Sequence, residues 1–176
     1  MIVSLPDMQA TAGFGAALAP LLGAGDTVLL EGPLGAGKTA LARAIIQARL
    51  AADGATDGST DGASEEVPSP SFTLVQVYGA APEIWHCDLY RLHSAQEVEE
   101  LGLADAFDRA LVLIEWPDRL GPLQPQRHIR VALADAPVPP TPAPIGFEEP
   151  GRLAQLTASG SGWEALLDRA AAWRAE

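Results

Sequence analysis

The chain has 176 residues and a formal net charge of −12, with 11 basic against 23 acidic side chains. This length predicts a single domain with a proper core, and so few cations argue against tight, direct binding of RNA or DNA. No apolar run approaches a membrane span, no secretory leader is visible, and Cys87 is the only cysteine. We therefore expect a cytoplasmic protein that has neither an intrachain disulfide nor a membrane partner.

The first part of the chain predicts a helix followed by a buried strand. Residues 9–22 place Phe14 and Leu18 at helical spacing, and Gly23 and Gly25 end that pattern. Residues 27–31 (TVLLE) form a short, mostly apolar run, as expected of a strand buried in a parallel sheet.

The segment from Gly32 to Thr39 reads GPLGAGKT, a complete G-x-x-x-x-G-K-[ST] phosphate-binding loop. It lies between the expected strand and a helix predicted over residues 39–50, which is the order that this motif requires. Glycines let backbone N–H groups point inward, and the helix N-terminus adds partial positive charge, so the loop forms an anion site. The sequence therefore predicts binding of a nucleoside triphosphate.

Lys38 is the only lysine, since the other ten basic side chains are arginines. A compact ammonium on a flexible stem reaches between β- and γ-phosphate oxygens, where a planar guanidinium is too wide. Thr39 would place its hydroxyl on a magnesium ion. The expected phosphate-binding residues are Leu34, Gly35, Ala36, Gly37, Lys38 and Thr39.

Two later segments predict irregular structure. Residues 51–66 (AADGATDGSTDGASEE) combine Asp-Gly repeats with small and acidic residues, and we expect a disordered surface loop there. Residues 136–150 contain six prolines and should be irregular linker or edge structure.

The rest of the chain predicts five more strands and two helices. The strands are expected over residues 73–78, 83–87, 111–114, 129–133 and 152–157. The helices are expected over 95–101, with a capping box from Ser94 to Glu97, and over 162–174. Strands mixed with helices around a phosphate loop indicate an α/β, three-layer P-loop NTPase fold with a mostly parallel central sheet.

Two acids at strand ends are candidates to complete a magnesium site. Glu115 directly follows the apolar run 111–114, and Asp88 follows the strand expected over 83–87. Both would project into the crevice at the carboxyl edge of the sheet, where the phosphate loop also lies. One would hold magnesium, directly or through water, and the other would orient the attacking water. The spacing leaves open which acid does which.

Other polar groups have less specific patterns. His86 fits no standard zinc spacing and is interpreted as a polar histidine of a strand. Ser69, Ser71 and Thr73 lie in an extended segment, where their hydroxyls either sense the γ-phosphate or make turn hydrogen bonds. Arg91, close to Asp88 in sequence, is a candidate arginine finger.

Four motifs in order resemble the bacterial tRNA threonylcarbamoyladenosine biosynthesis ATPase family, TsaE. They are residues 34–39 (LGAGKT), 69–75 (SPSFTLV), 86–92 (HCDLYRL) and 115–117 (EWP). The resemblance implies a P-loop ATPase that uses ATP and Mg²⁺ and acts on a partner complex of TsaD and TsaB. It also implies that the protein does not itself transfer the threonylcarbamoyl group and meets tRNA only through these partners.

By position, the resemblance also implies roles for individual residues. Lys38 would bind phosphates, and Thr39 and Glu115 would bind magnesium. Asp88 would assist hydrolysis. Trp116 would lie close to the site, and Thr11 falls in a segment that lies near the adenine in this family. Ser71 stands where threonine is usual and keeps the hydroxyl.

Three other functional classes share part of this pattern. A GTPase switch needs an Asn/Thr-Lys-x-Asp motif, which is impossible when Lys38 is the only lysine. A small-molecule or nucleotide kinase needs the same loop plus an acceptor pocket and an arginine-rich lid; Arg119, Arg127 and Arg130 cluster, but no lid-like insertion carries them. A nucleotide-responsive binding module without useful catalysis is the third alternative.

Because no arginine beyond Arg91 suggests an arginine finger, we expect slow intrinsic hydrolysis that depends on partners.

Overall fold

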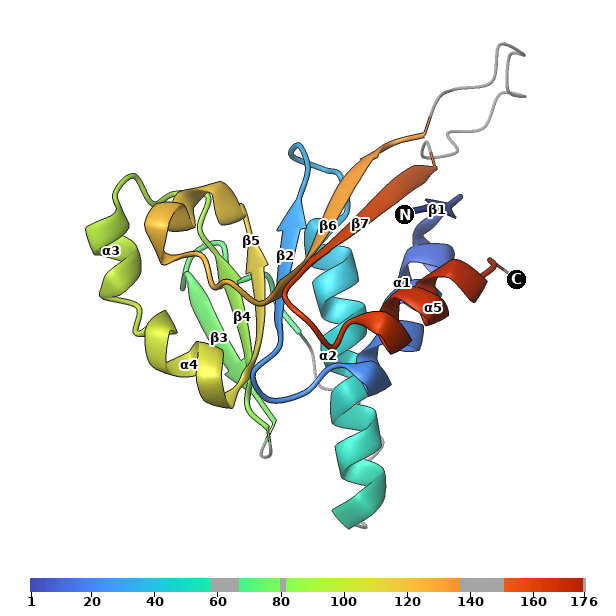
Figure 1. Ribbon diagram of the computed structural model, residues 1–176, viewed down its shortest axis with the longest axis horizontal. Coiled ribbons are helices and arrows are strands. Elements are labelled where there is room, and N and C mark those ends of the chain that lie inside the picture. Colours follow the sequence, from blue (N-terminus) through green and yellow to red (C-terminus); the bar gives the residue numbers. More distant parts are fainter. Residues whose placement is uncertain (58–66, 80–81, 137–150, 176) are drawn as a thin grey trace.

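A seven-stranded sheet in the order β1-β7-β6-β2-β5-β4-β3 crosses the molecule (Figure 1). The computed structural model describes residues 1–57, 67–79, 82–136 and 151–175. The strands are β1 (Ile2–Leu5), β2 (Thr27–Glu31), β3 (Val75–Tyr78), β4 (Ile84–Asp88), β5 (Leu111–Glu115), β6 (His128–Asp135) and β7 (Arg152–Ser159). Strands β6, β2, β5 and β4 pair in parallel, whereas β1, β7 and β3 join antiparallel at the edges.

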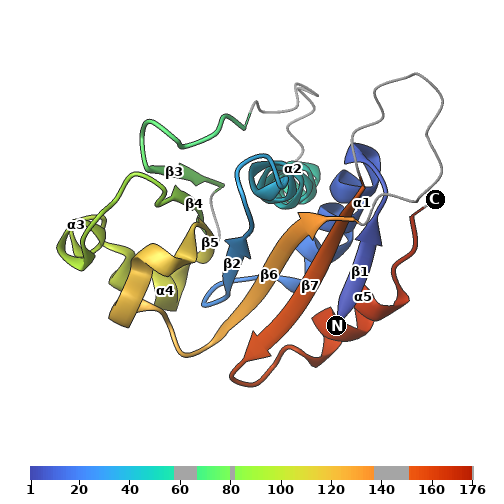
Figure 2. The ribbon, with the colours of Figure 1, turned by 90° about the horizontal axis from the view of Figure 1, so that it is seen from above.

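Helices cover both faces of this sheet. They are α1 (Met8–Leu18), α2 (Lys38–Asp57), α3 (Ala95–Glu99), α4 (Leu103–Arg109) and α5 (Glu164–Ala172), with 3-10 segments η1 (Ala19–Leu21) and η2 (Pro117–Leu123). Figure 2 shows α2 and α4 on opposite sides of the sheet. The predicted three-layer α/β fold with a parallel centre is confirmed.

The middle of strand β2 is apolar on both faces. Val28 and Leu30 belong to the core cluster under α1, α2 and α5, whereas Leu29 belongs to the cluster under α3 and α4. Successive side chains of a strand point to opposite faces, so a strand covered on both sides needs an apolar residue at every position. Burial of both faces holds the carboxyl end of β2, and the loop that follows it, in a fixed place.

The structure corrects several expected boundaries. Helix α2 continues to Asp57, so a disordered loop starting at residue 51 is wrong for residues 51–57; the alanines there are strong helix formers. The remainder of that segment (58–66) and nearly all of the proline-rich segment (137–150) lie outside the described residues.

Other local predictions were incomplete. β1 and α4 were not expected, because each is too short to show a clear period. Strand β3 begins at Val75 rather than at Thr73, since Leu74 has a φ of 65° that interrupts an extended chain. The capping box at Ser94 and Glu97 is confirmed, and its backbone hydrogen bonds lower the pKa of the Glu97 carboxyl. In the part of the chain that the structure describes, no helix is long and apolar enough to cross a membrane.

Candidate active site

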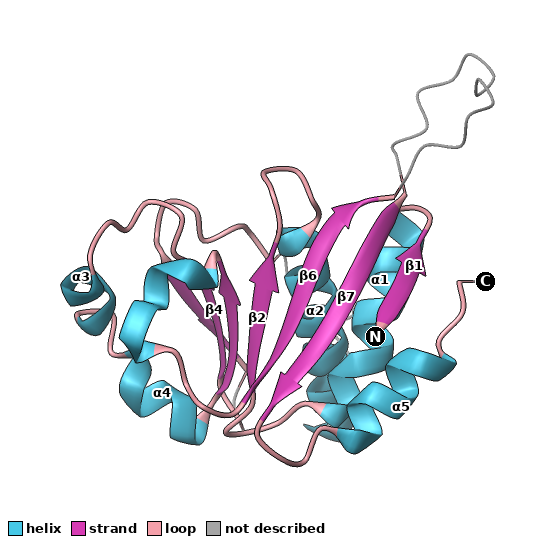
Figure 3. Ribbon diagram, turned by 45° about the horizontal axis from the view of Figure 1, so that its top comes forward, coloured by secondary structure: helices cyan, strands magenta, loops and turns pink. Residues whose placement is uncertain are grey.

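The loop from Gly32 to Gly37 joins β2 to α2 at the carboxyl edge of the parallel strands (Figure 3). On neighbouring strands, Glu115 pairs in register with both Leu30 and Asp88. The two predicted acids therefore end their strands side by side, next to the loop. This is the crevice in which parallel α/β sheets bind ligands.

Two glycines of the loop combine positive φ with a close neighbour. A Cβ on Gly32, where φ is 139°, would lie 2.4 Å from the carbonyl oxygen of Leu133. A Cβ on Gly37, where φ is 96°, would lie 3.2 Å from the side chain of Arg152. Since α2 begins at Lys38, its free N–H groups and positive end adjoin this loop, and the combination fits a phosphate group.

The Lys38 side chain folds back over the loop. Its Nζ donates to the carbonyl oxygens of Gly32 and Pro33, each at 2.8 Å, and lies 3.9 Å from the centre of the Trp116 ring. Lys38 is only 4% exposed. Burial lowers the pKa of its ammonium below the ordinary value, while the carboxylates of Glu115 and Asp88 act in the opposite direction. The ammonium is thus held where phosphates on the loop would meet it.

Glu115 connects the loop helix to the sheet. Its Oε2 accepts a hydrogen bond of 2.8 Å from the Thr39 hydroxyl, and its Oε1 lies 2.9 Å from His86 Nε2. Glu115 is 2% exposed. The oxygens of Thr39 and Glu115, with Asp88 nearby, are the hard ligands that Mg²⁺ prefers.

These groups do not form a metal cage by themselves. Among the residues that the structure describes, no cluster of three or more His, Cys, Asp or Glu side chains could hold a metal ion. Mg²⁺ is commonly bound through one or two carboxylates together with phosphate oxygens and water. The donor set therefore fits Mg²⁺ that arrives with a nucleotide.

Asp88 is hydrogen-bonded to the segment Val67–Leu74. Its Oδ2 accepts from the Ser71 hydroxyl at 2.9 Å, and its backbone N–H donates to the Leu74 carbonyl at 2.9 Å. The Thr73 hydroxyl instead accepts a hydrogen bond of 3.4 Å from Gln76 and is exposed. Of the three hydroxyls predicted as sensors, that of Ser71 donates to Asp88, whereas that of Ser69 contacts the Ser71 hydroxyl.

Two arginines hold the Val67–Leu74 segment from outside. Arg91 donates through Nη2 to the Phe72 carbonyl at 2.8 Å, and Arg43 donates through Nε to the Val67 carbonyl at 2.8 Å. The assignment of Arg91 as an arginine finger remains a prediction.

Both non-glycine residues with positive φ among those described flank this site. They are Leu74, with φ of 65°, and Trp116, with φ of 60°. The Trp116 ring covers Lys38 and packs against Tyr90 with ring centres 4.8 Å apart. Such conformations cost energy and persist where the surrounding structure imposes them. Trp116 thus lies beside Lys38, as expected.

Thr11, another predicted site residue, lies in α1, the helix that packs against α2. It lies in the first turn of α1, is fully buried, and donates its hydroxyl to the Asp7 carbonyl at 3.1 Å. Its side chain thus has an internal partner, and a contact with adenine remains a prediction.

Sequence reasoning missed Arg152, which lies across the phosphate loop. This buried residue begins β7, donates through Nη2 to the Gly35 carbonyl at 3.2 Å, and covers Gly37. It is 117 residues from Gly35 in the chain and belongs to no motif. The only available signal was a basic residue on the same face of the strand as the buried Ala154 and Leu156.

We expect the Arg152→Met substitution to weaken ATP binding about 10–100-fold, because the loop loses a charged hydrogen bond worth about 1.5–3 kcal/mol. Arg152→Lys should not restore binding, since an ammonium cannot reproduce the planar fork. Titration calorimetry with Mg·ATP measures both effects. Arg174→Met is the matched control, because Arg174 also donates to carbonyl oxygens but lies near the end of the chain. Equal ATP affinities of the Arg152→Met and Arg174→Met variants would refute this role.

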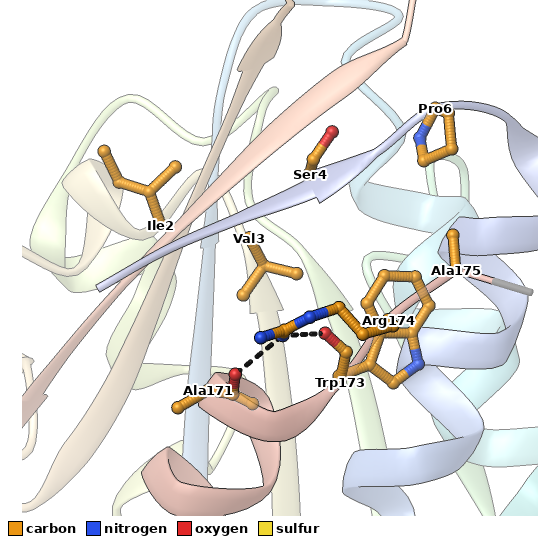
Figure 4. Close-up of a pocket in the computed structure, with 9 residues that line it drawn as sticks. Ile2, Val3, Ser4, Pro6, Ala171, Trp173, Arg174 and Ala175 are labelled. Atoms are coloured by element: carbon orange, nitrogen blue, oxygen red, sulfur yellow. Dashed lines mark hydrogen bonds between the residues drawn. The ribbon is translucent and has the colours of Figure 1, made fainter.

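A separate groove of about 360 Å³ lies between β1 and the end of α5 (Figure 4). Its lining is mostly apolar and includes Ile2, Val3 and Trp173. The Arg174 guanidinium in this groove donates to the carbonyls of Ala171 and Trp173. None of the described residues that line it belongs to the phosphate loop or to the acids beside it, so the groove has no part in the candidate site.

Comparison with known proteins assigns the chain to a family. The family model described as "Threonylcarbamoyl adenosine biosynthesis protein TsaE" matches residues 5–138. The chain belongs to the TsaE family. This match includes the phosphate loop, Asp88, Glu115 and Trp116 but ends before Arg152.

Individual relatives support the assignment. The TsaE protein of Rickettsia bellii is 39% identical over 126 residues, which is 71% of this chain and 80% of the relative. The TsaE protein of Mycobacterium tuberculosis is 34% identical over 140 residues, covering 74% of this chain and 76% of the relative. The crystal structure of YdiB from Bacillus subtilis matches with a TM-score of 0.66 and 20% identity over 97% of this chain and 93% of that one, which supports the fold. The family is named for threonylcarbamoyl adenosine biosynthesis.

Proposed function

We propose that this chain binds ATP with Mg²⁺ and hydrolyses it slowly, as the ATPase component of the tRNA threonylcarbamoyladenosine machinery. The observation that carries the proposal is the hydrogen bond between Thr39, at the start of α2, and Glu115, at the end of β5. It joins a complete phosphate-binding loop to a strand-terminal acid, as in P-loop enzymes that hold magnesium between these two elements.

Each residue has a role in this proposal. The loop amides and the Lys38 ammonium bind and neutralise the phosphates. Thr39 and Glu115 would hold Mg²⁺, which when bound withdraws negative charge from phosphate oxygens. Asp88, one strand further along, would orient the attacking water, because its carboxylate is free of the Thr39–Glu115 pair and faces the Ser71 hydroxyl.

Partner proteins would raise the rate of this slow ATP hydrolysis. The described arginines near the site contact backbone carbonyls: Arg91 contacts Phe72, and Arg152 contacts Gly35. A finger supplied by another protein raises hydrolysis by about 10³–10⁵-fold in related phosphoryl-transfer systems. We propose TsaD and TsaB as the partner complex, with tRNA met only through them.

A kinase is disfavoured by what two of its three candidate arginines contact. Arg127 pairs with Asp26 and donates to the Gly25 carbonyl, and Arg130 pairs with Glu31. These contacts anchor both guanidinium groups to the ends of β2, so the two side chains are not available to a closing lid.

The test compares ATP consumption by the chain alone, with TsaD and TsaB, and with candidate small-molecule acceptors. We expect slow phosphate release by the chain alone and a large increase with the partner pair. Phosphorylation of an acceptor would instead establish a kinase. ATP binding without hydrolysis in any mixture would indicate a nucleotide-responsive binding module.

A further inference from the structure

A completely buried histidine contacts the acid assigned to magnesium. His86 lies within β4, is 0% exposed, and places Nε2 2.9 Å from Glu115 Oε1. Within the described residues, its other ring nitrogen, Nδ1, is buried without a hydrogen-bond partner. No sequence pattern predicts this contact, because β4 and β5 meet only in the folded sheet.

The contact determines where the imidazole carries its hydrogen. A carboxylate oxygen only accepts, so the hydrogen bond to Glu115 requires the hydrogen on Nε2. In the neutral ring, Nδ1 is then a buried acceptor that has no partner among the described residues, which is unfavourable for folding. An apolar side chain would avoid this cost, so packing alone gives no reason for a histidine here.

The histidine completes the orientation of the Glu115 carboxylate. One oxygen of Glu115 faces His86, and the other accepts from the Thr39 hydroxyl. With both oxygens engaged, the carboxylate cannot rotate without breaking one of the two hydrogen bonds. Outer-sphere hydrogen bonds of this kind orient the groups that bind metals.

We propose that His86 is a positioning residue for Mg²⁺. It fixes the Glu115 carboxylate in the orientation in which Glu115 and Thr39 would together hold the ion. This rests on the proposed function of the site as a Mg·ATP site. His86 touches neither nucleotide nor metal in this scheme and acts only through Glu115. Its loss should therefore change how much Mg²⁺ is needed, and leave the loop's own affinity for phosphates in place.

The experiment uses His86→Leu, which removes the donor, and His86→Gln, whose amide nitrogen can donate from a similar distance. Calorimetry gives the ATP affinity in EDTA and the Mg²⁺ concentration at which the magnesium-dependent gain in ATP binding is half complete. We expect His86→Leu to need about 10–100-fold more Mg²⁺ than the unmodified chain. His86→Gln should bring the Mg²⁺ requirement most of the way back to that of the unmodified chain. All three proteins should bind ATP equally in EDTA.

Three outcomes separate the possibilities. An unchanged Mg²⁺ requirement in His86→Leu overturns the positioning role, and so does an equal loss of ATP affinity with and without Mg²⁺, which indicates a structural role only. Should His86→Leu not fold, as judged by circular dichroism, His86→Asn takes its place, since its shorter amide does not reach Glu115. If the unmodified chain shows no Mg·ATP binding, the site assignment itself fails, independently of His86.

Discussion

The Lys38→Ala variant is expected to lose ATP hydrolysis and to bind ATP about 10–100-fold more weakly. Lys38 is the only lysine of the chain, and its ammonium lies at the phosphate loop beside Glu115 and Asp88. Charged hydrogen bonds of this kind are worth about 1.5–3 kcal/mol, and the loss is greater where charge develops in the transition state. Phosphate release and calorimetric titration measure the two effects.

Lys38→Arg is the matched control for charge. The planar guanidinium keeps the positive charge but does not fit between the carbonyl oxygens that hold the ammonium, so we expect hydrolysis to remain lost. Melting temperatures of both variants show whether the fold is intact. Hydrolysis at the unmodified rate in Lys38→Ala would rule out this site.

The second large effect is expected from Gly32→Ala. A Cβ at this position would lie 2.4 Å from the Leu133 carbonyl oxygen, and the φ of 139° suits only glycine. The loop must then shift away from β6, at a cost of about 2–3 kcal/mol in the free energy of unfolding. That corresponds to a melting temperature lower by roughly 4–12 °C, together with weakened ATP binding.

Two other glycines are matched controls for this substitution. Gly35 also has positive φ, at 81°, but a Cβ added there would meet no atom within 4 Å, so Gly35→Ala should cost only about 1–2 kcal/mol. Gly23 has neither positive φ nor a close neighbour, so Gly23→Ala should leave stability unchanged or slightly raised. Equal melting temperatures for Gly32→Ala and Gly23→Ala would show that the close contact with the Leu133 carbonyl does not affect stability.

Local features of the site could be predicted from the sequence. Strand, phosphate loop and helix follow one another without interruption, and Glu115 directly follows an apolar run. Their chemistry depends on residues that are neighbours in the chain, so a pattern is sufficient. Parallel strands also end at one edge of the sheet, which is why Asp88 could be expected near Glu115 before the strand order was known.

The contacts that pattern reading missed depend on strand order or on distant segments. His86 meets Glu115 because β4 lies beside β5, and Arg152 reaches the loop because β7 joins β6 at the far side of β2. Neither neighbour relation is encoded in a local period. The strained backbone of Leu74 and Trp116 likewise follows from packing around the site, since both side chains belong to residue types that rarely adopt positive φ.

The most direct test of the central claim is a calorimetric titration of the purified, folded chain with ATP in the presence of Mg²⁺. We predict saturable binding of one nucleotide per chain, strengthened by Mg²⁺ and weakened by Lys38→Ala. A folded chain that binds no ATP under these conditions, or that binds it equally well after Lys38→Ala, would contradict the assignment of the loop as a nucleotide site.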